Sequence, residues 1–258
     1  MRKILPLIAT FFAFNAQASG GFTWISSVQH MLGTHLPEYM ISFTLVGLLI
    51  TVMGLLYRSK LSKVKNHIIP DKGITLRNIS EAYGNFIYGQ CKSILGEQYA
   101  AKYFSIVAYL FIMILISNLI GLVPGFLPPT EYLNATLALG IFSFVVYNII
   151  GVKENGVINY VKHFAGPLWY MAILVFPIEI ISNLVRPLSL ALRLRGNMFG
   201  DHLVLSEFTK LVPAFIPMAA LALGLLVCFI QAYVFTILSM VYISLALPHD
   251  HGEHAQSI

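Results

Sequence analysis

Three arginines lie within ten residues of one another inside an apolar stretch that runs from about residue 168 to residue 205: Arg186, Arg193 and Arg195. An arginine at bilayer depth costs at least about 2.5–3.5 kcal/mol on insertion scales, so it persists there only where it faces protein or water. Seven polar residues, here called the polar stripe, project within an arc of roughly 120° of a single helix: Glu179, Ser182, Arg186, Ser189, Arg193, Asn197 and Asp201. Arg195 and His202 project to the other side. The stripe therefore marks an ion pathway or a buried partner.

The composition indicates a polytopic membrane protein. Hydrophobic residues make up 57% of the 258 residues and charged residues 10%, whereas soluble domains carry about 25% charged residues. The net charge of +5 could suggest nucleic-acid binding. However, four basic residues directly follow an apolar segment, a position where positive charge fixes the orientation of a membrane protein: Arg58, Lys60, Lys63 and Lys65. The two cysteines, Cys91 and Cys228, have no ligand-like spacing and predict neither a disulfide framework nor a metal site.

The chain divides into a short leader and one membrane domain. Residues 1–18 have a basic start, an apolar run and small residues before Ser19, which predicts a bacterial signal peptide; an uncleaved anchor is the alternative. In the membrane domain, residues 19–258, we expect spans at about 40–56, 104–123, 133–151, 168–205 and 211–247. Residues 74–101 are too polar to cross and predict an amphipathic helix or hairpin at the cytoplasmic surface.

The last two apolar stretches are too long for upright spans. A helix of about 38 residues is about 57 Å long, almost twice a hydrocarbon core of about 30 Å. Each stretch is either two short spans with a reversal or one steeply tilted helix. The continuous polar stripe favours one bent, tilted helix, which Pro177 and Pro187 could kink. We therefore expect an all-α fold with about five membrane-penetrating helices, the last two long and steeply tilted. The N-terminus is expected in the periplasm and the C-terminus in the cytoplasm.

Two motifs carry a resemblance to a known family. Arg193 opens an R-L-x-G-N-M pattern that contains Asn197, and Gln231 opens a Q-A-x-x-F pattern that precedes V-Y. Pro187 and Glu179 precede Arg193 at the spacings found in the same family. These segments resemble the carboxy-terminal helix pair of subunit a of F-type ATP synthases, and the similarity covers about residues 40–247.

The resemblance implies a proton-conducting stator in the inner membrane, beside a rotating c-ring whose proteolipid subunits each carry one buried carboxylate. The implied partners are this c-ring, b-type peripheral stalk subunits, the rest of the ATP synthase and membrane lipid, with no nucleic acid, cofactor, metal or nucleotide site. Arg193 would be the essential charge facing the c-ring carboxylate, because a guanidinium attracts a carboxylate without accepting its proton.

The resemblance also implies roles along the proton pathway. Glu179 is expected on the exit side, His202 on the entry side, and Gln231 as the hydrogen-bonding neighbour of Arg193. The remaining pathway candidates are Ser189, Asn197 and Asp201, and those with secondary roles are Ser182, Arg186 and Tyr242. His202 and Gly224 stand where the best-studied bacterial pattern has glutamate and histidine, which indicates a small residue opposite a larger titratable one.

Other residues and other functions stay open. We expect Arg195 to form a structural ion pair or to contact lipid headgroups, and Glu131 to be a solvated loop residue. The tail cluster could bind a metal, but a polar tail is the simpler interpretation: His249, Asp250, His251, Glu253 and His254. The alternative function is an autonomous secondary antiporter with a buried arginine site, although no paired repeats are visible. An integral-membrane enzyme would need a metal site or a nucleophile–base pair, and the sequence shows neither.

Overall fold

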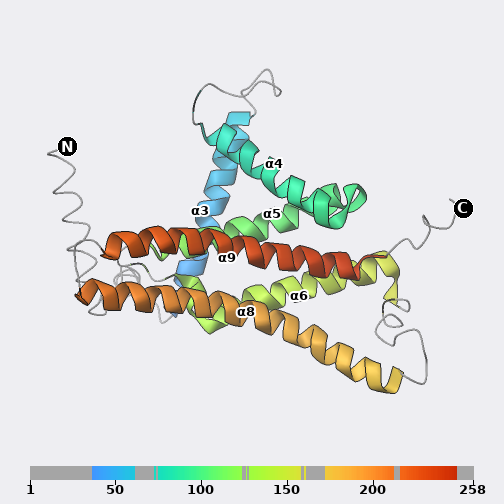
Figure 1. Ribbon diagram of the computed structural model, residues 1–258. Coiled ribbons are helices and arrows are strands. Elements are labelled where there is room, and N and C mark those ends of the chain that lie inside the picture. Colours follow the sequence, from blue (N-terminus) through green and yellow to red (C-terminus); the bar gives the residue numbers. More distant parts are fainter. Residues whose placement is uncertain are drawn as a thin grey trace, which may run out of the picture.

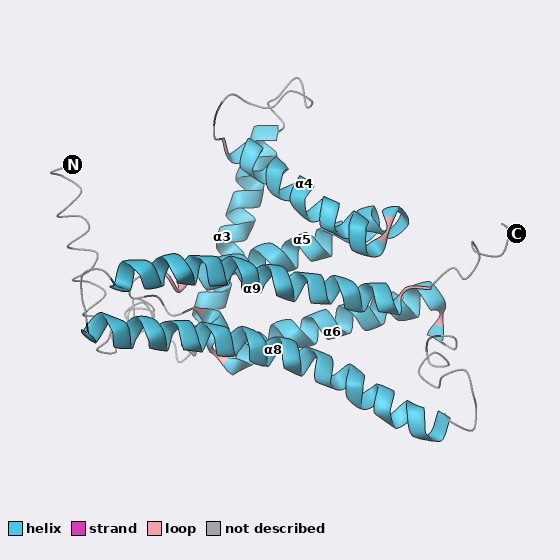
Figure 2. Cartoon of the chain, in the orientation of Figure 1, coloured by secondary structure: helices cyan, strands magenta, loops and turns pink. Residues whose placement is uncertain are grey.

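All the regular structure in the described part of the chain is helical (Figure 2). The computed structural model describes residues 37–61, 73, 75–123, 126, 128–157, 160, 172–211 and 216–248, so the predicted signal peptide and the histidine-rich tail lie outside the described residues. The helices are α3 (Glu38–Leu61), α4 (Leu76–Leu95), α5 (Glu97–Ile120), the 3-10 turn η1 (Pro129–Glu131), α6 (Leu133–Asn155), α8 (Ala172–Leu211) and α9 (Ile216–Ala246).

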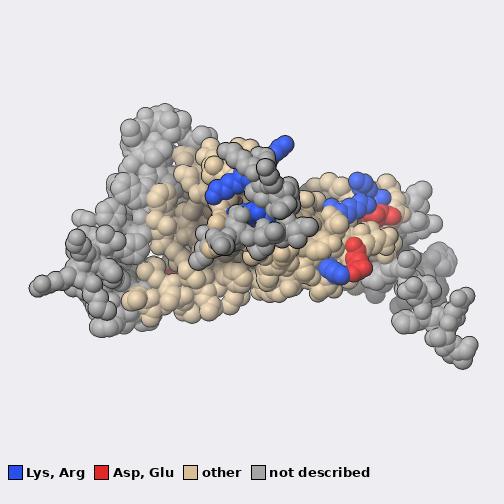
Figure 3. Space-filling model, turned by 90° about the horizontal axis from the view of Figure 1, so that it is seen from above, with Lys and Arg blue, Asp and Glu red and all other residues tan. Residues whose placement is uncertain are grey.

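Five of these helices, α3, α5, α6, α8 and α9, are long and apolar enough to cross a membrane. This number confirms the all-α prediction with about five spans. The span expected at 104–123 starts several residues after the true helix start, because α5 already begins at Glu97. The charged first turn of α5 lowers the local hydropathy, so hydropathy alone does not reveal this start. On the face seen in Figure 3, lysine and arginine side chains gather in patches with wide uncharged areas between them, as expected for helices whose sides face lipid.

The two C-terminal helices are single and continuous over the described residues. α8 is 40 residues long and contains both Pro177 and Pro187, and α9 is 31 residues long. Figure 1 shows the two helices side by side toward the end of α8, and α8 diverging from α9 toward its start, with α3 passing behind α9 in this view. The prediction of long helices rather than paired short spans is confirmed.

Pro187 is accommodated inside α8 by contacts from α6. A proline removes the hydrogen bond to the carbonyl four residues earlier, which here belongs to Asn183. The hydroxyl of Tyr147 lies 3.4 Å from that carbonyl oxygen and also contacts the side-chain oxygen of Asn183. Two turns earlier on α6, Gly140 lets the helices approach: a Cβ at this position would lie 2.6 Å from the carbonyl oxygen of Pro187. The middle of α8 is therefore fixed against α6.

Contacts between helix ends define two ends of the bundle. At one end, Lys102 at the start of α5 forms a 2.5 Å ion pair with Glu154 at the end of α6, and Asn155 donates to the carbonyl of Ala246 on α9. We call this the Glu154 end. At the other end, Tyr132 beside η1 contacts Glu38 at the start of α3; we call it the η1 end. α8 starts near the first end and reaches η1 at the second.

The predicted amphipathic segment is α4. Its backbone starts at an N-cap, where the hydroxyl of Thr75 accepts from the amide of Asn78, and turns into α5 at Gly96, whose φ of 80° favours glycine. Its apolar face packs against protein: the Cys91 thiol lies 3.7 Å from the sulfur of Met240 on α9, and the Tyr83 hydroxyl donates to the carbonyl of Ala108 on α5. The amphipathic prediction is confirmed, and α4 is clamped to two of the apolar helices.

This packing predicts the reactivity of Cys91. Burial raises the pKa of the Cys91 thiol to about 11, so its thiolate fraction at pH 8 is more than about 100-fold below that of an ordinary cysteine. In a Cys228→Ser background, maleimide labelling should be correspondingly slow and should accelerate with pH. Ser93, exposed on the same helix, supplies the control: Ser93→Cys, in a chain lacking both native cysteines, should label quickly. Equal labelling rates would contradict the packing of α4.

The contact between α6 and α8 predicts a second effect. Gly140→Ala forces a methyl group against the backbone carbonyl of Pro187 and should lower stability by about 1–3 kcal/mol. Gly47 on α3 has no neighbouring atom within 4 Å of an added Cβ, so Gly47→Ala should be neutral or slightly stabilising. The thermal aggregation midpoint of the detergent-solubilised chain measures both. A midpoint for Gly140→Ala as high as that for Gly47→Ala would show that the two helices are not in contact there.

Candidate functional site

The polar stripe lies beside the buried face of α8 rather than inside it. The residues that α8 buries against its neighbours are Asn183, Pro187, Leu190, Ala191, Leu194 and Met198. On the stripe, Ser182, Arg193 and Asn197 are exposed, whereas Glu179, Ser189 and Asp201 are half-buried. The middle of the stripe thus faces outward from the helix bundle, where another molecule could reach it.

Arg193 occupies this outward-facing middle, and none of the described residues is its partner. Its side chain is exposed, and among the residues that the structure describes no hydrogen bond or ion pair is found for it. The expected contact with Gln231 takes a different form: the Gln231 oxygen accepts a 2.6 Å hydrogen bond from Asn197, one turn further along α8. Gln231 is 3% exposed, so this bond joins α8 to α9 one turn from Arg193 and does not involve its guanidinium.

A first group of polar side chains, here called the Glu179 cluster, lies toward the Glu154 end. It consists of Glu179, Asn183, Arg186, Tyr147 and Tyr242. The guanidinium of Arg186 is 3.6 Å from the Glu179 carboxylate and 5.2 Å from the centre of the Tyr242 ring, an attractive cation–π arrangement. Arg186 and Glu179, seven residues apart on α8, thus form an ion pair within the cluster.

The Glu179 cluster extends toward Tyr160. The Tyr160 hydroxyl donates to Asn148 on α6 at 2.9 Å. Burial raises the pKa of Tyr160, and the positive charge of Arg186 opposes that rise. Arg186 therefore acts electrostatically on tyrosines that lie outside its own helix. Ser182 is exposed and is not among the cluster's contacts.

A second group, the His202 cluster, lies at the η1 end and consists of His202, Asp201, Glu131 and Asn118. Nδ1 of His202 is 3.5 Å from Oε2 of Glu131. The expectation that Glu131 is a solvated loop residue is wrong: its Oε2 is buried and accepts no hydrogen bond from the described residues. Beside it, burial raises the pKa of Tyr132, and the carboxylates of Glu38 and Glu131 add to the effect. No periodicity in the sequence could reveal this contact, because Glu131 lies in a turn.

Arg195 bonds to the same turn. Its Nε donates to the backbone carbonyl of Glu131 at 3.4 Å, and the side chain is otherwise exposed. Among the described residues Arg195 thus forms a hydrogen bond to a carbonyl and not the ion pair that was one of the two expectations. The other, contact with lipid headgroups, stays a prediction. Arg195 points away from the stripe, as its position on the helix predicts.

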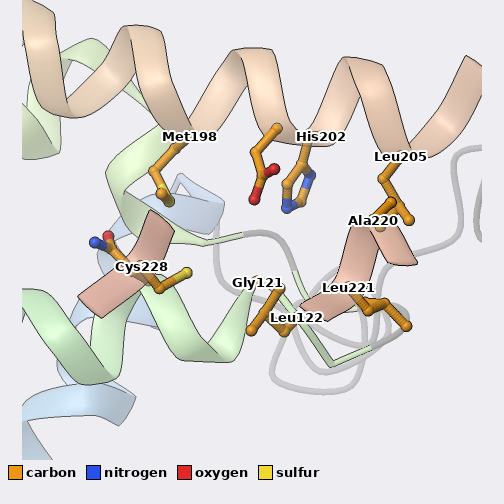
Figure 4. Close-up of a pocket in the computed structure, with 10 residues that line it drawn as sticks. Gly121, Leu122, Met198, His202, Leu205, Ala220, Leu221 and Cys228 are labelled. Carbon is orange, nitrogen blue, oxygen red and sulfur yellow. The ribbon is translucent and has the colours of Figure 1, made fainter. Parts of the chain in front are cut away.

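A small cavity lies between α8, α9 and the end of α5 (Figure 4). Its volume is about 10 Å³, close to the minimum for one water molecule, and its polar lining comes from Asn118, Asp201 and His202. A carboxylate oxygen of Asp201 lies 2.7 Å from the position that a Cβ of Gly224 would take. The small residue on α9 therefore makes room for Asp201, whereas the sequence comparison had set it opposite His202.

Metal binding has no support in the part of the chain that the structure describes, which contains no group of three or more histidine, cysteine or acidic side chains close enough to hold an ion. The histidine-rich tail lies outside the described residues. Further along α9, the hydroxyl of Ser239 meets that of Ser143 on α6 at 2.9 Å in a buried contact, which we interpret as packing.

Comparison with known proteins decides the family. Residues 40–244 match the family described as ATP synthase A chain. The chain belongs to this family. It is 45% identical over 199 residues to ATP synthase subunit a of Bdellovibrio bacteriovorus, covering 77% of this chain and 86% of that protein. It is 38% identical over 222 residues to the subunit a of Campylobacter concisus, covering 86% and 94%. The subunit a of Sorangium cellulosum is 38% identical over 220 residues, covering 83% and 86%.

Gly224 gives the site a testable coupling. In Gly224→Val the new methyl groups collide with the Asp201 carboxylate, so the thermal midpoint should fall by the equivalent of about 1–3 kcal/mol. Asp201→Gly in the same chain should restore most of it, because the two residues share one space. Gly196→Val is the matched control: its Cβ meets no atom within 4 Å, and its effect should not depend on Asp201. Additive effects of Gly224→Val and Asp201→Gly would place the two side chains apart.

Proposed function

We propose that this chain is the proton-translocating stator subunit of an F-type ATP synthase, forming two half-channels against the rotating c-ring and coupling proton flow to rotation and ATP synthesis. Membership of the ATP synthase A chain family supports this function. The observation that carries the mechanism is the exposed guanidinium of Arg193 at the outward-facing middle of α8, between two clusters of titratable side chains. It has no partner in the part of the chain that the structure describes.

Arg193 attracts a carboxylate of the ring as it passes and favours its ionised form, because a nearby cation lowers the pKa of a carboxyl group. The guanidinium stays protonated itself, so it cannot carry a proton across. A fixed positive charge also repels protons that would otherwise pass directly from one half-channel to the other. Protons must therefore travel on the ring, and their flow drives rotation.

The two clusters are the polar ends of the proposed half-channels. The His202 cluster, with its water-sized cavity, serves the entry side, since imidazole exchanges protons near neutral pH. The Glu179 cluster serves the exit side. Asn197 and Gln231 hold α8 to α9 beside Arg193, and Ser189 lies half-buried between Arg193 and Arg186. The secondary residues Arg186, Ser182 and Tyr242 line or border the exit side.

The orientation follows from charge. Arg58 and Lys60 end α3, and Lys102 and Lys153 lie at the Glu154 end, so this end faces the cytoplasm by the positive-inside rule. The N-terminus then lies in the periplasm and the C-terminus in the cytoplasm of the inner membrane. The proposed partners are the c-ring proteolipid on the open side of α8, the b-type peripheral stalk and the rest of the complex.

The first test is ATP-driven proton pumping in inverted membrane vesicles. Arg193→Ala should abolish pumping, because the ring carboxylate loses its counter-charge, while Arg195→Ala should retain it, because Arg195 bonds only a backbone carbonyl. Co-purification of the ring and the soluble ATPase subunits checks that both complexes assemble. Normal pumping by an assembled Arg193→Ala complex would contradict the stator function and favour the autonomous antiporter.

A further inference from the structure

We propose that a groove between α3, α4 and α5 binds one phospholipid of the cytoplasmic leaflet, with an acyl chain in the groove and the phosphate beside Arg58 and Lys60. The site is separate from the polar stripe and from the two clusters, so the proposal goes beyond the stator function. Only the assignment to the cytoplasmic leaflet rests on the orientation proposed for the chain.

The groove, here called the α3 groove, has a volume of about 660 Å³, within the range of about 300–1,000 Å³ that is typical of small-molecule sites. Figure 1 shows α3 and α4 spreading apart from a common end, and α3 contacts α5 as well as α4. The hydroxyl of Tyr83 on α4 donates to the carbonyl of Ala108 on α5, and both residues line the groove. Three helices therefore bound the α3 groove, and two of them are joined by a hydrogen bond within its lining.

The lining of the α3 groove changes from polar to apolar. The polar side chains come from α4 and from the last turns of α3: Ser80, Glu81, Asn85, Tyr88 and Tyr57. The apolar side chains come from the preceding turns of α3 and from α5: Ile50, Met53, Phe104, Ala108 and Ile112. Tyrosine is enriched at the level of lipid headgroups. A molecule with one polar end and an apolar tail fits this order of side chains.

The length of the α3 groove matches a single leaflet. On α3 its lining runs from Ile50 to Tyr57, which is about 10 Å along a helix at 1.5 Å per residue. A membrane-crossing helix of another chain needs contact across about 30 Å of hydrocarbon, so most of such a helix would lie outside the groove. The acyl chains of one leaflet occupy half of that thickness. The length therefore favours a lipid over a helix of a partner chain.

The charge at the end of α3 is complementary to a phosphate. Arg58 and Lys60 follow the groove within one turn, lie to either side of its α3 face, and are exposed. Neither forms an ion pair with any of the described residues. The one acidic residue of the lining, Glu81, is 2.6 Å from the guanidinium of Arg77, so its charge is balanced. The net charge beside the groove is thus positive, and basic residues at the cytoplasmic surface attract anionic lipid.

α3 is also the span that the rest of the chain covers least. In its most apolar stretch of 18 residues 11% are buried, compared with 22–44% in the other four spans. Protein contacts alone therefore hold α3 over a small part of its surface. A lipid in the α3 groove adds apolar contact on the side where α3 and α4 separate, and it becomes part of the packing of this helix.

The test is photo-crosslinking of the complete ATP synthase complex in vesicles of phosphatidylethanolamine and phosphatidylglycerol, in which a small share of the phosphatidylglycerol carries a diazirine in its acyl chain. Peptide mass spectrometry then locates the crosslinks, which we expect on groove residues such as Met53 and Ile112. Gly54→Leu should lower labelling of Ile112 about tenfold, because the leucine side chain takes the place of about two methylene groups of the acyl chain.

Gly47→Leu is the matched control for Gly54→Leu. Both glycines lie on the same face of α3, two turns apart, and an added Cβ meets no atom within 4 Å at either position. Only Gly54 lines the α3 groove, so Gly47→Leu should leave the labelling of Ile112 unchanged. Since neither leucine collides with the chain itself, a difference between the two variants reports on what fills the groove.

A second pair of variants tests the phosphate. Arg58→Gln and Lys60→Gln should each lower labelling of Ile112 by phosphatidylglycerol about fivefold, because each removes one cation from beside the headgroup. Lys153→Gln is the control: Lys153 is exposed near the end of α6, at the same end of the bundle, and α6 does not line the groove. Its labelling should equal that of the unaltered complex.

Two results would overturn the proposal. Equal labelling along all sides of α3, with no effect of Gly54→Leu, would mean that only bulk lipid touches this helix. Labelling of α3 outside the groove but not within it would mean that another protein chain covers the groove. If Gly54→Leu does not assemble, the unaltered labelling pattern and the two charge variants decide in its place. Proton pumping by Arg193→Ala tests the stator function separately, and its loss together with uniform labelling of α3 would reject the lipid site alone.

Discussion

A guanidinium without a protein partner, in the middle of an apolar helix, is the constraint on which the rest of this structure depends. A buried charge must be paired, yet the structure pairs Arg193 with nothing that it describes and leaves it exposed. The nearest amides are occupied with each other, since Asn197 donates to Gln231. Such an arrangement is stable in a membrane only if water or another chain covers the charge. The open side of α8 is thus best understood as an interface, and the family of the chain fits a ring that turns against it.

The other contacts of α8 keep that charge in place. Because Pro187 breaks the hydrogen-bonded ladder two turns before Arg193, the helix would be free to bend there. α6 prevents this by bringing Gly140 against the proline backbone and the Tyr147 hydroxyl against the carbonyl of Asn183. Arg186, rather than joining Arg193, is held by Glu179 and the Tyr242 ring. Arg186 and Arg195 therefore have partners of their own, and among the described arginines of α8 only Arg193 is left for the proposed ring carboxylate.

The sequence predicted what depends on periodicity and failed where tertiary contacts decide. The polar stripe, the continuous long helices and the amphipathic α4 all follow from spacing along one helix. The partner of Gln231 could not be predicted from such spacing, because the choice between Arg193 and Asn197 depends on the rotation of α9 against α8. Glu131 was misread since turn residues carry no periodic signal, and its burial arises only when η1 folds onto α8. Gly224 was correctly seen as making room for a titratable residue, but the helix rotation gives that room to Asp201.

The spacing of the two clusters argues for water-filled access on both sides. Glu179 and Asp201 are 22 residues apart on α8, which is about 33 Å along a helix at 1.5 Å per residue. An upright helix would therefore put both clusters at the edges of a hydrocarbon layer about 30 Å thick. A steeply tilted one brings both inside that layer, where an isolated carboxylate or imidazolium is unstable. Each cluster then needs its own polar partners, and each has them: Arg186 beside Glu179, and Glu131 beside His202. A steeply tilted α8 would thus require a counter-charge at each of the two clusters.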